Sequence, residues 1–314
     1  MSAPVRGLIE PKSWSGPLDL YATLECGQTY CWRRSDGQMF SGDPPAADAW
    51  YETVVGADDP RVDAPVTLRI RQQPDGLAYE ASEEAEELIR SLIGLDDPLE
   101  DIYAAMPSHP LITAAIERYP GLRIVADPPV ACLLSFICSA QMRVARTYQL
   151  QLQIAETFGQ SWGWDGVQLR AFPTAERLAQ ASETELRELG LGYRAPYVVD
   201  SAELIATGEL HPTDVRGLPY EQARTELTRF IGVGEKVADC VLLFALGYHE
   251  AVPLDTWMRK VINSYLPHVD DGSYTDLSAG IRQSFGGDIA GYTQTHVFHL
   301  LRQTPKQDLP PGAS

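Results

Sequence analysis

The chain has 314 residues, 44% of them hydrophobic, and a formal net charge of −18, so it can bury a substantial core and form more than one domain. It has no apolar run long enough to span a membrane and no signal-peptide-like N-terminus, which predicts an intracellular protein, in the cytoplasm or nucleoid of a prokaryote. Its five cysteines have no paired spacing and none follows Cys240, which argues against a disulfide scaffold, a zinc site or a C-terminal iron–sulfur cluster.

The N-terminal residues predict an antiparallel β-sheet domain over 1–98. Apolar residues alternate with polar ones over 18–24 and again over 66–70, which is the period of a half-buried strand. Turn-forming sequences separate such runs at 35–37, 42–45 and 74–76. We also expect a helix near 82–93.

From residue 99 the pattern becomes helical and predicts an all-helical body over 99–304, so the fold class is α+β. Pro129 begins an apolar helix, residues 144–158 are amphipathic, and Ser182 to Glu185 form a capping box. Pro196 stands where another helix can begin. Further helices are expected at 220–230, 236–247, 256–266, 275–285 and 288–302. We expect the tail, 305–314, to be disordered.

The most informative stretch is 224–262, which predicts a helix-hairpin-helix at 220–247. Gly232-Val233-Gly234 lies between two amphipathic segments, and Lys236 follows two residues later. Glycines permit the tight turn, and the free amides at the start of the second helix can bind a phosphate. Lys236 and, nineteen positions on, Asp255 supply a nucleophile and a carboxylate partner. Singly, each of these features would be a turn, a solvated lysine or a helix N-cap.

Taken together, these residues resemble the helix-hairpin-helix of base-excision DNA glycosylases. The resemblance is most specific to the eukaryotic-type 8-oxoguanine DNA glycosylase/lyase and extends from about residue 17 to residue 303. It rests on the segments Gly27-Gln28-Thr29-Tyr30-Cys31-Trp32-Arg33, Leu134-Ser135-Phe136-Ile137-Cys138-Ser139-Ala140-Gln141 and Leu189-Gly190-Leu191-Gly192-Tyr193-Arg194-Ala195.

The resemblance implies a bifunctional enzyme that excises 8-oxoguanine. Lys236 attacks C1′ of the extruded nucleotide and forms an imine, Asp255 stabilises the developing positive charge, and β-elimination cleaves the strand. Attack requires a neutral amine, so we expect burial to lower the pKa of Lys236. The expected base pocket consists of Gly27, Cys240, Pro253, Gln294 and Phe298. In it, the Gly27 carbonyl accepts N7–H, which only the oxidised base carries.

The resemblance also implies the DNA contacts, which are Gln141, Arg146, Tyr193, Arg194, Gly232, Val233, Gly234, Val237 and Trp257. Two of them depart from the family: Gln141 stands where an asparagine fills the gap left by the extruded base, and Trp257 replaces a histidine that contacts phosphate. No cofactor is expected, except that the main-chain carbonyls of Thr228, Phe230 and Val233 offer a site for a monovalent cation. The expected partner is double-stranded DNA with oxidised guanine opposite cytosine, bound by a monomer.

The acidic composition is unusual for a DNA-binding protein, because basic patches normally supply the attraction. The acidic excess lies elsewhere, since residues 224–262 carry no net charge. Only four of the 25 basic residues are lysines, which resembles proteins of salt-accumulating halophiles. In molar salt the Debye length is about 3 Å, so repulsion of DNA is screened.

Two alternatives remain open. A monofunctional alkylpurine glycosylase of the same superfamily uses the aspartate and water, but it lacks a lysine at the position of Lys236. A non-catalytic helix-hairpin-helix module needs only the glycine turn, and neither Asp255 nor the Gln294–Phe298 pair.

Overall fold

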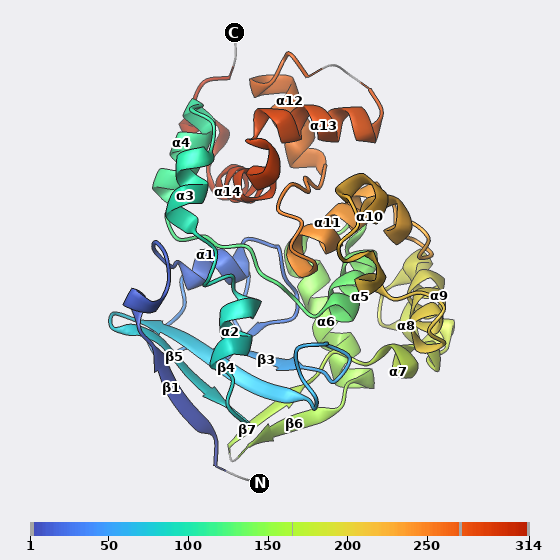
Figure 1. The fold of residues 1–314 in the computed structure, drawn as a ribbon. Coiled ribbons are helices and arrows are strands. Elements are labelled where there is room, and N and C mark those ends of the chain that lie inside the picture. Colours follow the sequence, from blue (N-terminus) through green and yellow to red (C-terminus); the bar gives the residue numbers. More distant parts are fainter. Residues whose placement is uncertain (1–2, 165, 270–271, 313–314) are drawn as a thin grey trace.

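An antiparallel sheet forms the N-terminal part of the protein, as the alternating sequence predicts (Figure 1). The computed structural model describes residues 3–164, 166–269 and 272–312. The strands lie in the order β1 (Val5–Ile9), β5 (Gly76–Ala81), β4 (Val66–Gln73), β3 (Tyr51–Val55) and β2 (Arg33–Arg34). The predicted turn at 74–76 joins β4 to β5 and sets their register, in which Gln73 pairs with Gly76. Helix α2 (Glu86–Leu92) follows the sheet.

The expected strand at 18–24 is wrong, because these residues form helix α1 (Leu20–Glu25). The Asp19 side chain caps the helix by accepting a hydrogen bond from the Ala22 amide at 2.8 Å. Every residue of α1 except Tyr21 is buried, so the alternation of residue types does not correspond to alternating exposure. A short segment buried on most sides carries no periodicity from which helix and strand can be distinguished.

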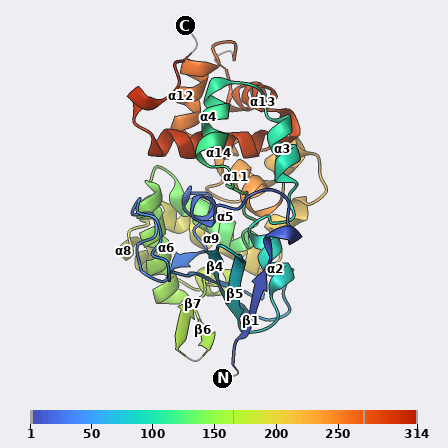
Figure 2. The same cartoon turned by 90° about the vertical axis from the view of Figure 1, so that its left-hand side faces the viewer.

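The helical body confirms most of the predicted helices. It contains α3 (Leu99–Ala105), α4 (Pro110–Arg118), α5 (Pro129–Ser139), α6 (Val144–Phe158), α7 (Ala175–Ala179), α8 (Glu183–Glu188), α9 (Ala195–Ala206), α10 (Tyr220–Leu227), α11 (Glu235–Ala245), α12 (Thr256–Tyr265), α13 (Tyr274–Ser284) and α14 (Ala290–Gln303). The capping box at Ser182 is present, with Glu185 donating its amide to the serine and accepting in return. Figure 2 shows α3 and α4 beside α14, so the first helices of the body pack against its last one.

A two-stranded hairpin within the helical body escaped the sequence analysis. Strands β6 (Ser161–Trp164) and β7 (Val167–Arg170) pair with each other, and Trp164, Val167 and Leu169 pack on Val54 of the sheet. Arg33 donates a hydrogen bond to the Gln168 carbonyl at 2.6 Å. The hairpin therefore packs the helical body against the sheet. Each strand is only four residues long, which is too short for its alternation to be distinctive.

One continuous core extends from the sheet into the helices, and α5 lies at its centre. All residues of α5 are buried, and the helix packs against α9 and α11. Gly291 of α14 lies so close to α11 that a β-carbon there would be 2.4 Å from Leu243. The sheet domain therefore shares one core with the helices, and α14 packs closely against α11 within the helical body.

The described part of the tail contacts the helical body, and its expected disorder stays a prediction. Residues Lys306–Asp308 form a 3-10 turn, and the Tyr265 hydroxyl donates to the Pro310 carbonyl at 2.8 Å. This contact with α12 is between residues far apart in sequence, so composition alone does not reveal it. Within the described ranges, every helix is too short or too polar to cross a membrane.

Candidate active site

The hairpin between α10 and α11 has two glycines with different structural roles. Gly232 has φ +83°, and a β-carbon there would lie 2.7 Å from the Tyr197 side chain, so both conformation and packing require glycine. Gly234 has an ordinary extended conformation and caps α11, with open space where its β-carbon would be. The amides of the first turn of α11 therefore face an unobstructed approach, which suits an anion.

Helix α9 supports the hairpin from behind. Ser201 donates a hydrogen bond to the Ile231 carbonyl at 2.9 Å. Tyr193 and Tyr197 pack with their ring centres 6.2 Å apart, and Tyr193 is 47% exposed. Val233 and Val237 are buried, so their main chain, rather than their side chains, can meet DNA.

Lys236 lies in the first turn of α11, half-buried, with its amine 5.3 Å from the centre of the Phe136 ring. Burial lowers its pKa, but the acidic groups around the amine, first among them Cys240, raise it more, and the net shift is upward. The expectation of a lowered pKa is therefore wrong for the DNA-free protein. The amine is held as an ammonium at neutral pH and must lose its proton before it can attack.

Asp255 is fixed in place by the helix that it caps. Its Oδ1 accepts hydrogen bonds from the Trp257 and Met258 amides, both at 2.9 Å. Burial raises the pKa of Asp255, while these amides and the charge of Lys236 oppose the rise. Asp255 raises the pKa of Lys236 and Lys236 lowers the pKa of Asp255, so each charge acts on the other group.

Helices α11 and α14 supply the expected walls of the base pocket. Cys240 is buried one turn after Lys236, and burial raises its pKa to about 11, so it is a neutral thiol at neutral pH. Gln294 and Phe298 share a face of α14. Gln294 is almost fully buried and accepts a hydrogen bond from Thr295 at 3.3 Å, and Phe298 is half-buried. Pro253, also buried, precedes Asp255.

The N-terminal segment brings Gly27 to the same region. Gly27 has φ +100°, and a β-carbon there would be 3.0 Å from Arg302 of α14 and 3.1 Å from Val144. Gln28 anchors the segment: its Nε2 donates to the Thr23 and Arg123 carbonyls, both at 2.7 Å. The carbonyl of Gly27 is thereby held by a rigid support.

The residues expected to contact the opposite strand lie near one another, but one of them already makes a hydrogen bond within the protein. Gln141 is exposed with φ +55°, and Arg146 lies 2.9 Å from the β-carbon position of Gly190. Arg194, in contrast, is buried and donates to the Ala140 carbonyl at 2.9 Å. In the DNA-free protein it holds the loop before Gln141, and a contact with cytosine would require it to leave that carbonyl.

Trp257, which stands where the resemblance has a histidine, has a lysine beside it. Trp257 is half-buried, and the Lys260 amine lies 4.1 Å from the centre of its ring. A cation therefore stands beside the position where the resemblance has a histidine.

Two family models match consecutive parts of the chain. The 8-oxoguanine DNA glycosylase N-terminal domain matches residues 12–133, and the HhH-GPD superfamily base excision DNA repair protein matches residues 134–282. The chain belongs to the helix-hairpin-helix superfamily of base-excision repair proteins. The two matches meet at α5, whereas our predicted domain boundary at residue 98, which stays a prediction, lies before α3.

Relatives in this superfamily match nearly the whole chain. A probable N-glycosylase/DNA lyase of Methanothermobacter thermautotrophicus is 28% identical over 92% of this chain and 95% of the relative. The N-glycosylase/DNA lyase OGG1 of Arabidopsis thaliana is 27% identical over 92% and 78%, respectively. The solved Clostridium acetobutylicum 8-oxoguanine glycosylase/lyase, in complex with double-stranded DNA containing cytosine opposite 8-oxoG, superposes with TM-score 0.78, 25% identity and 96% coverage of both chains.

The cation site expected in the superfamily hairpin stays a prediction. Of its three carbonyls, that of Phe230 already accepts a hydrogen bond from the Val233 amide at 3.1 Å. Over the described ranges, the acidic, cysteine and histidine side chains form no cluster of three or more suited to a metal.

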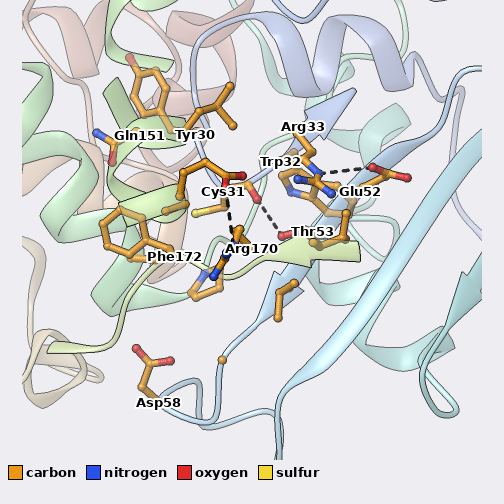
Figure 3. A pocket seen from close by; sticks show the side chains of 18 residues that line it. Tyr30, Cys31, Trp32, Arg33, Glu52, Thr53, Asp58, Gln151, Arg170 and Phe172 are labelled. Atoms are coloured by element: carbon orange, nitrogen blue, oxygen red, sulfur yellow. Dashed lines mark hydrogen bonds and ion pairs between the residues drawn. The ribbon is translucent and has the colours of Figure 1, made fainter. Parts of the chain in front are cut away.

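A separate cavity of about 50 Å³ lies between β3, β7 and α6 (Figure 3). It is lined by Tyr30, Thr53 and Gln151 and by the ion pair of Arg33 with Glu52 at 3.3 Å, and not by Lys236 or Asp255. This cavity is at the junction of the sheet with the helical body.

The structure adds three residues to the predicted site. Tyr30 and Phe136 pack with ring centres 5.6 Å apart beside Lys236, and both belong to the segments that carry the family resemblance. Arg302 is the third, with its guanidinium 5.3 Å from the Phe298 ring centre. Arg302 could have been predicted from the sequence, because it continues the four-residue spacing of Gln294 and Phe298 along one face of α14.

Proposed function

We propose that this protein is a bifunctional DNA glycosylase that excises 8-oxoguanine from duplex DNA through an imine of Lys236 and then cleaves the strand. The observation that carries the proposal is that Lys236 and Cys240 lie in the first turns of α11, just after the glycine hairpin, and that Lys236 and Asp255 each shift the other's pKa. The relatives' names support it, since two are N-glycosylase/DNA lyases and the third is an 8-oxoguanine glycosylase/lyase.

The chemistry requires the base outside the duplex, because its glycosidic carbon is shielded within the stack. The neutral amine of Lys236 forms a bond to C1′ while the bond from C1′ to the base breaks, and the base leaves with the electron pair and takes up a proton. Asp255 remains ionised opposite the sugar and stabilises its positive charge. Its two amide hydrogen bonds keep the carboxylate oriented without a change of structure.

Strand cleavage follows from the covalent intermediate. The nitrogen on C1′ loses a proton, the C1′–O4′ bond breaks while O4′ takes up a proton, and an iminium forms between Lys236 and C1′. Loss of a proton from C2′ then expels the 3′ phosphate, which breaks the strand. Water attacking C1′ instead would release the base without cleavage, so a lysine at this position distinguishes the proposal from a monofunctional glycosylase.

We further propose the opposite base, the oligomeric state and the cofactor requirement of the enzyme. The lesion lies opposite cytosine, as in the complex of the Clostridium protein, and the protein acts as an intracellular monomer. No cofactor takes part, although the hairpin carbonyls of Thr228, Phe230 and Val233 offer a site for a monovalent cation. The acidic surface fits a halophilic source, in which screening permits DNA binding.

The test is base release from duplexes that carry 8-oxoguanine opposite each normal base, with borohydride added to trap an imine. The wild-type protein should release the base, cleave the strand and form a covalent adduct. Lys236→Gln should lose the adduct and cleavage but still bind the lesion duplex, because the hairpin and pocket remain. Lys306→Gln, which changes an exposed lysine outside the expected site, is the matched control and should keep the adduct.

The outcomes separate the alternatives. Base release without an adduct would favour the monofunctional enzyme, and an adduct in Lys236→Gln would mean that another amine is the nucleophile. Duplex binding without release of any base would favour the non-catalytic module.

A further inference from the structure

Arg302 lies between two walls of the base pocket that come from opposite ends of the chain. Its Nη1 donates a hydrogen bond to the Cys26 carbonyl, and the same atom is 3.0 Å from the β-carbon position of Gly27. Its guanidinium carbon is 5.3 Å from the centre of the Phe298 ring. The side chain therefore lies beside Gly27, whose carbonyl is the expected N7–H acceptor, and over the expected stacking ring.

Protein groups in the described part of the chain use only part of the hydrogen-bonding capacity of this guanidinium. An arginine has five N–H donors, and the structure records one acceptor for Arg302, the Cys26 carbonyl. Within the described part of the chain, Arg302 has no carboxylate at ion-pair distance, whereas most of its other half-buried arginines have one. The charge acts on the site instead, because Arg302 lowers the pKa of Asp255. A fixed, half-buried cation with free donors is suited to an oxygen-bearing ligand.

The ligand that fits is an oxidised purine. Oxidation at C8 places an N–H donor at N7 between two carbonyl oxygens, on C6 and on C8. Gly27 offers an acceptor and Arg302 offers a donor next to it, which is the complementary arrangement. As the base leaves, negative charge spreads onto those oxygens, so a guanidinium there would stabilise the transition state more than the ground state.

We infer that Arg302 is a base-recognition residue: held by the Cys26 carbonyl and lying over Phe298, it donates a hydrogen bond to a carbonyl oxygen of the extruded oxidised purine beside the Gly27 carbonyl. The inference rests on the proposed function, since it assigns a further contact in the same pocket. It predicts that Arg302 matters for release of the base and not for chemistry on a sugar whose base is already absent.

The experiment compares two substrates in each variant. Base release from 8-oxoguanine opposite cytosine is measured under single-turnover conditions, and borohydride trapping is measured on a duplex with a preformed abasic site. Arg302→Leu should slow base release about 10- to 100-fold, the loss expected for one charge-assisted hydrogen bond. Trapping on the abasic duplex should stay within about 2-fold, because no base is present to be recognised.

Arg118→Leu is the matched control. Arg118 also stands over an aromatic ring, that of Tyr119, with 5.9 Å to its centre, but it is exposed at the end of α4. The Arg118→Leu substitution removes the same charge and should change neither base release nor trapping on the abasic duplex. Arg302→Gln, which can still donate to Cys26, gives the same comparison if Arg302→Leu fails to fold.

Unchanged base release in Arg302→Leu would overturn the inference. An equal loss on the abasic duplex would also overturn it, because Arg302 would then support the fold of the site and not the base. Failure of the wild-type protein to release 8-oxoguanine would instead overturn the proposed function, so the two ideas fail in different ways.

Discussion

The catalytic side of the site and the side that faces the opposite strand differ in how they are prepared for DNA. Asp255 is oriented by two amides of α12, both of which donate to its Oδ1. Arg194 is bonded inward instead, to the Ala140 carbonyl, and its guanidinium lies 4.4 Å from the Tyr193 ring centre. The proposed electrostatic partner of the sugar is therefore already oriented in the DNA-free protein, whereas a contact of Arg194 with the orphaned base would require its hydrogen bond to Ala140 to be exchanged.

The largest effect should follow from Asp255→Asn, which tests the preorganised side. Asparagine can still cap α12, so the fold should persist, but the charge opposite the sugar is lost. Base release should slow by about 100- to 1,000-fold, as for loss of a fixed electrostatic group in other enzymes. Asp19→Asn, which changes the equivalent cap of α1 outside the site, is the control for single-turnover kinetics. Equal rates in the two variants would contradict an electrostatic role of Asp255.

A pair of glycine substitutions tests whether the hairpin is preorganised for phosphate. Gly234→Ala places a methyl group in open space at the start of α11, so it should cost less than about 1 kcal/mol of stability. It should weaken binding to any duplex about 10-fold, because a phosphate hydrogen bond is obstructed. Binding by fluorescence anisotropy and urea unfolding separate the two effects.

Gly232→Ala is the counterpart, and its effect on the fold should be larger. The methyl group would meet Tyr197 and the positive φ would be strained, so it should cost about 1–3 kcal/mol of unfolding free energy. If Gly234→Ala bound DNA like the wild-type protein, α11 would not be the phosphate anchor.

Among the residues expected to face the opposite strand, substitution of Arg194 should mainly lower stability, and substitution of Tyr193 should mainly weaken DNA binding. Arg194→Ala leaves the Ala140 carbonyl without its donor and should lower the unfolding free energy by about 1–3 kcal/mol. Tyr193→Ala removes a half-exposed ring and should change stability by no more than about 0.5 kcal/mol, while weakening lesion-duplex binding about 10-fold. A stable Arg194→Ala protein with altered opposite-base preference would show that Arg194 is already free to read DNA.

The last prediction concerns the effect of pH on stability through a buried carboxyl group of α11. Asp239 of α11 accepts hydrogen bonds from Tyr220 and Tyr274, both at 2.7 Å, yet burial raises its pKa to about 7. The folded state thus keeps a proton that the unfolded state loses near pH 4, so this group makes stability fall as pH rises from about 4 to 7.

Asp239→Asn should flatten that decline, by at most about 1.4 kcal/mol per pH unit. Urea unfolding at pH 4, 5, 6 and 7 measures it. Asp127, whose pKa burial also raises to about 7, should keep its own share of the slope, so some pH dependence should remain. An unchanged slope in the variant would mean that Asp239 is ionised throughout.

Sequence predicted those parts of the site that are encoded locally. The hairpin glycines, Lys236 and Asp255 lie within 24 residues of one another, and their helices begin and end close to the predicted positions. The errors are of another kind. The alternation at 18–24 lies in a buried helix, and the Trp-rich β6–β7 hairpin depends on packing against Val54. The upward shift of the Lys236 pKa depends on Cys240, Tyr30 and Asp255 together, which no single spacing conveys.

The contact between Cys26 and Arg302 joins residues 276 positions apart, and this has a consequence for the order in which the protein becomes active. Contacts of such separation require closure of a very long loop and form late in folding. During synthesis the hairpin is complete well before α14 leaves the ribosome. A nascent or C-terminally truncated chain can therefore present a phosphate-binding hairpin and the Lys236 amine before it has the second wall of a base pocket. Under the proposed function, recognition of the oxidised base therefore requires α14, and we expect it to arise only once that helix has packed on the N-terminal segment.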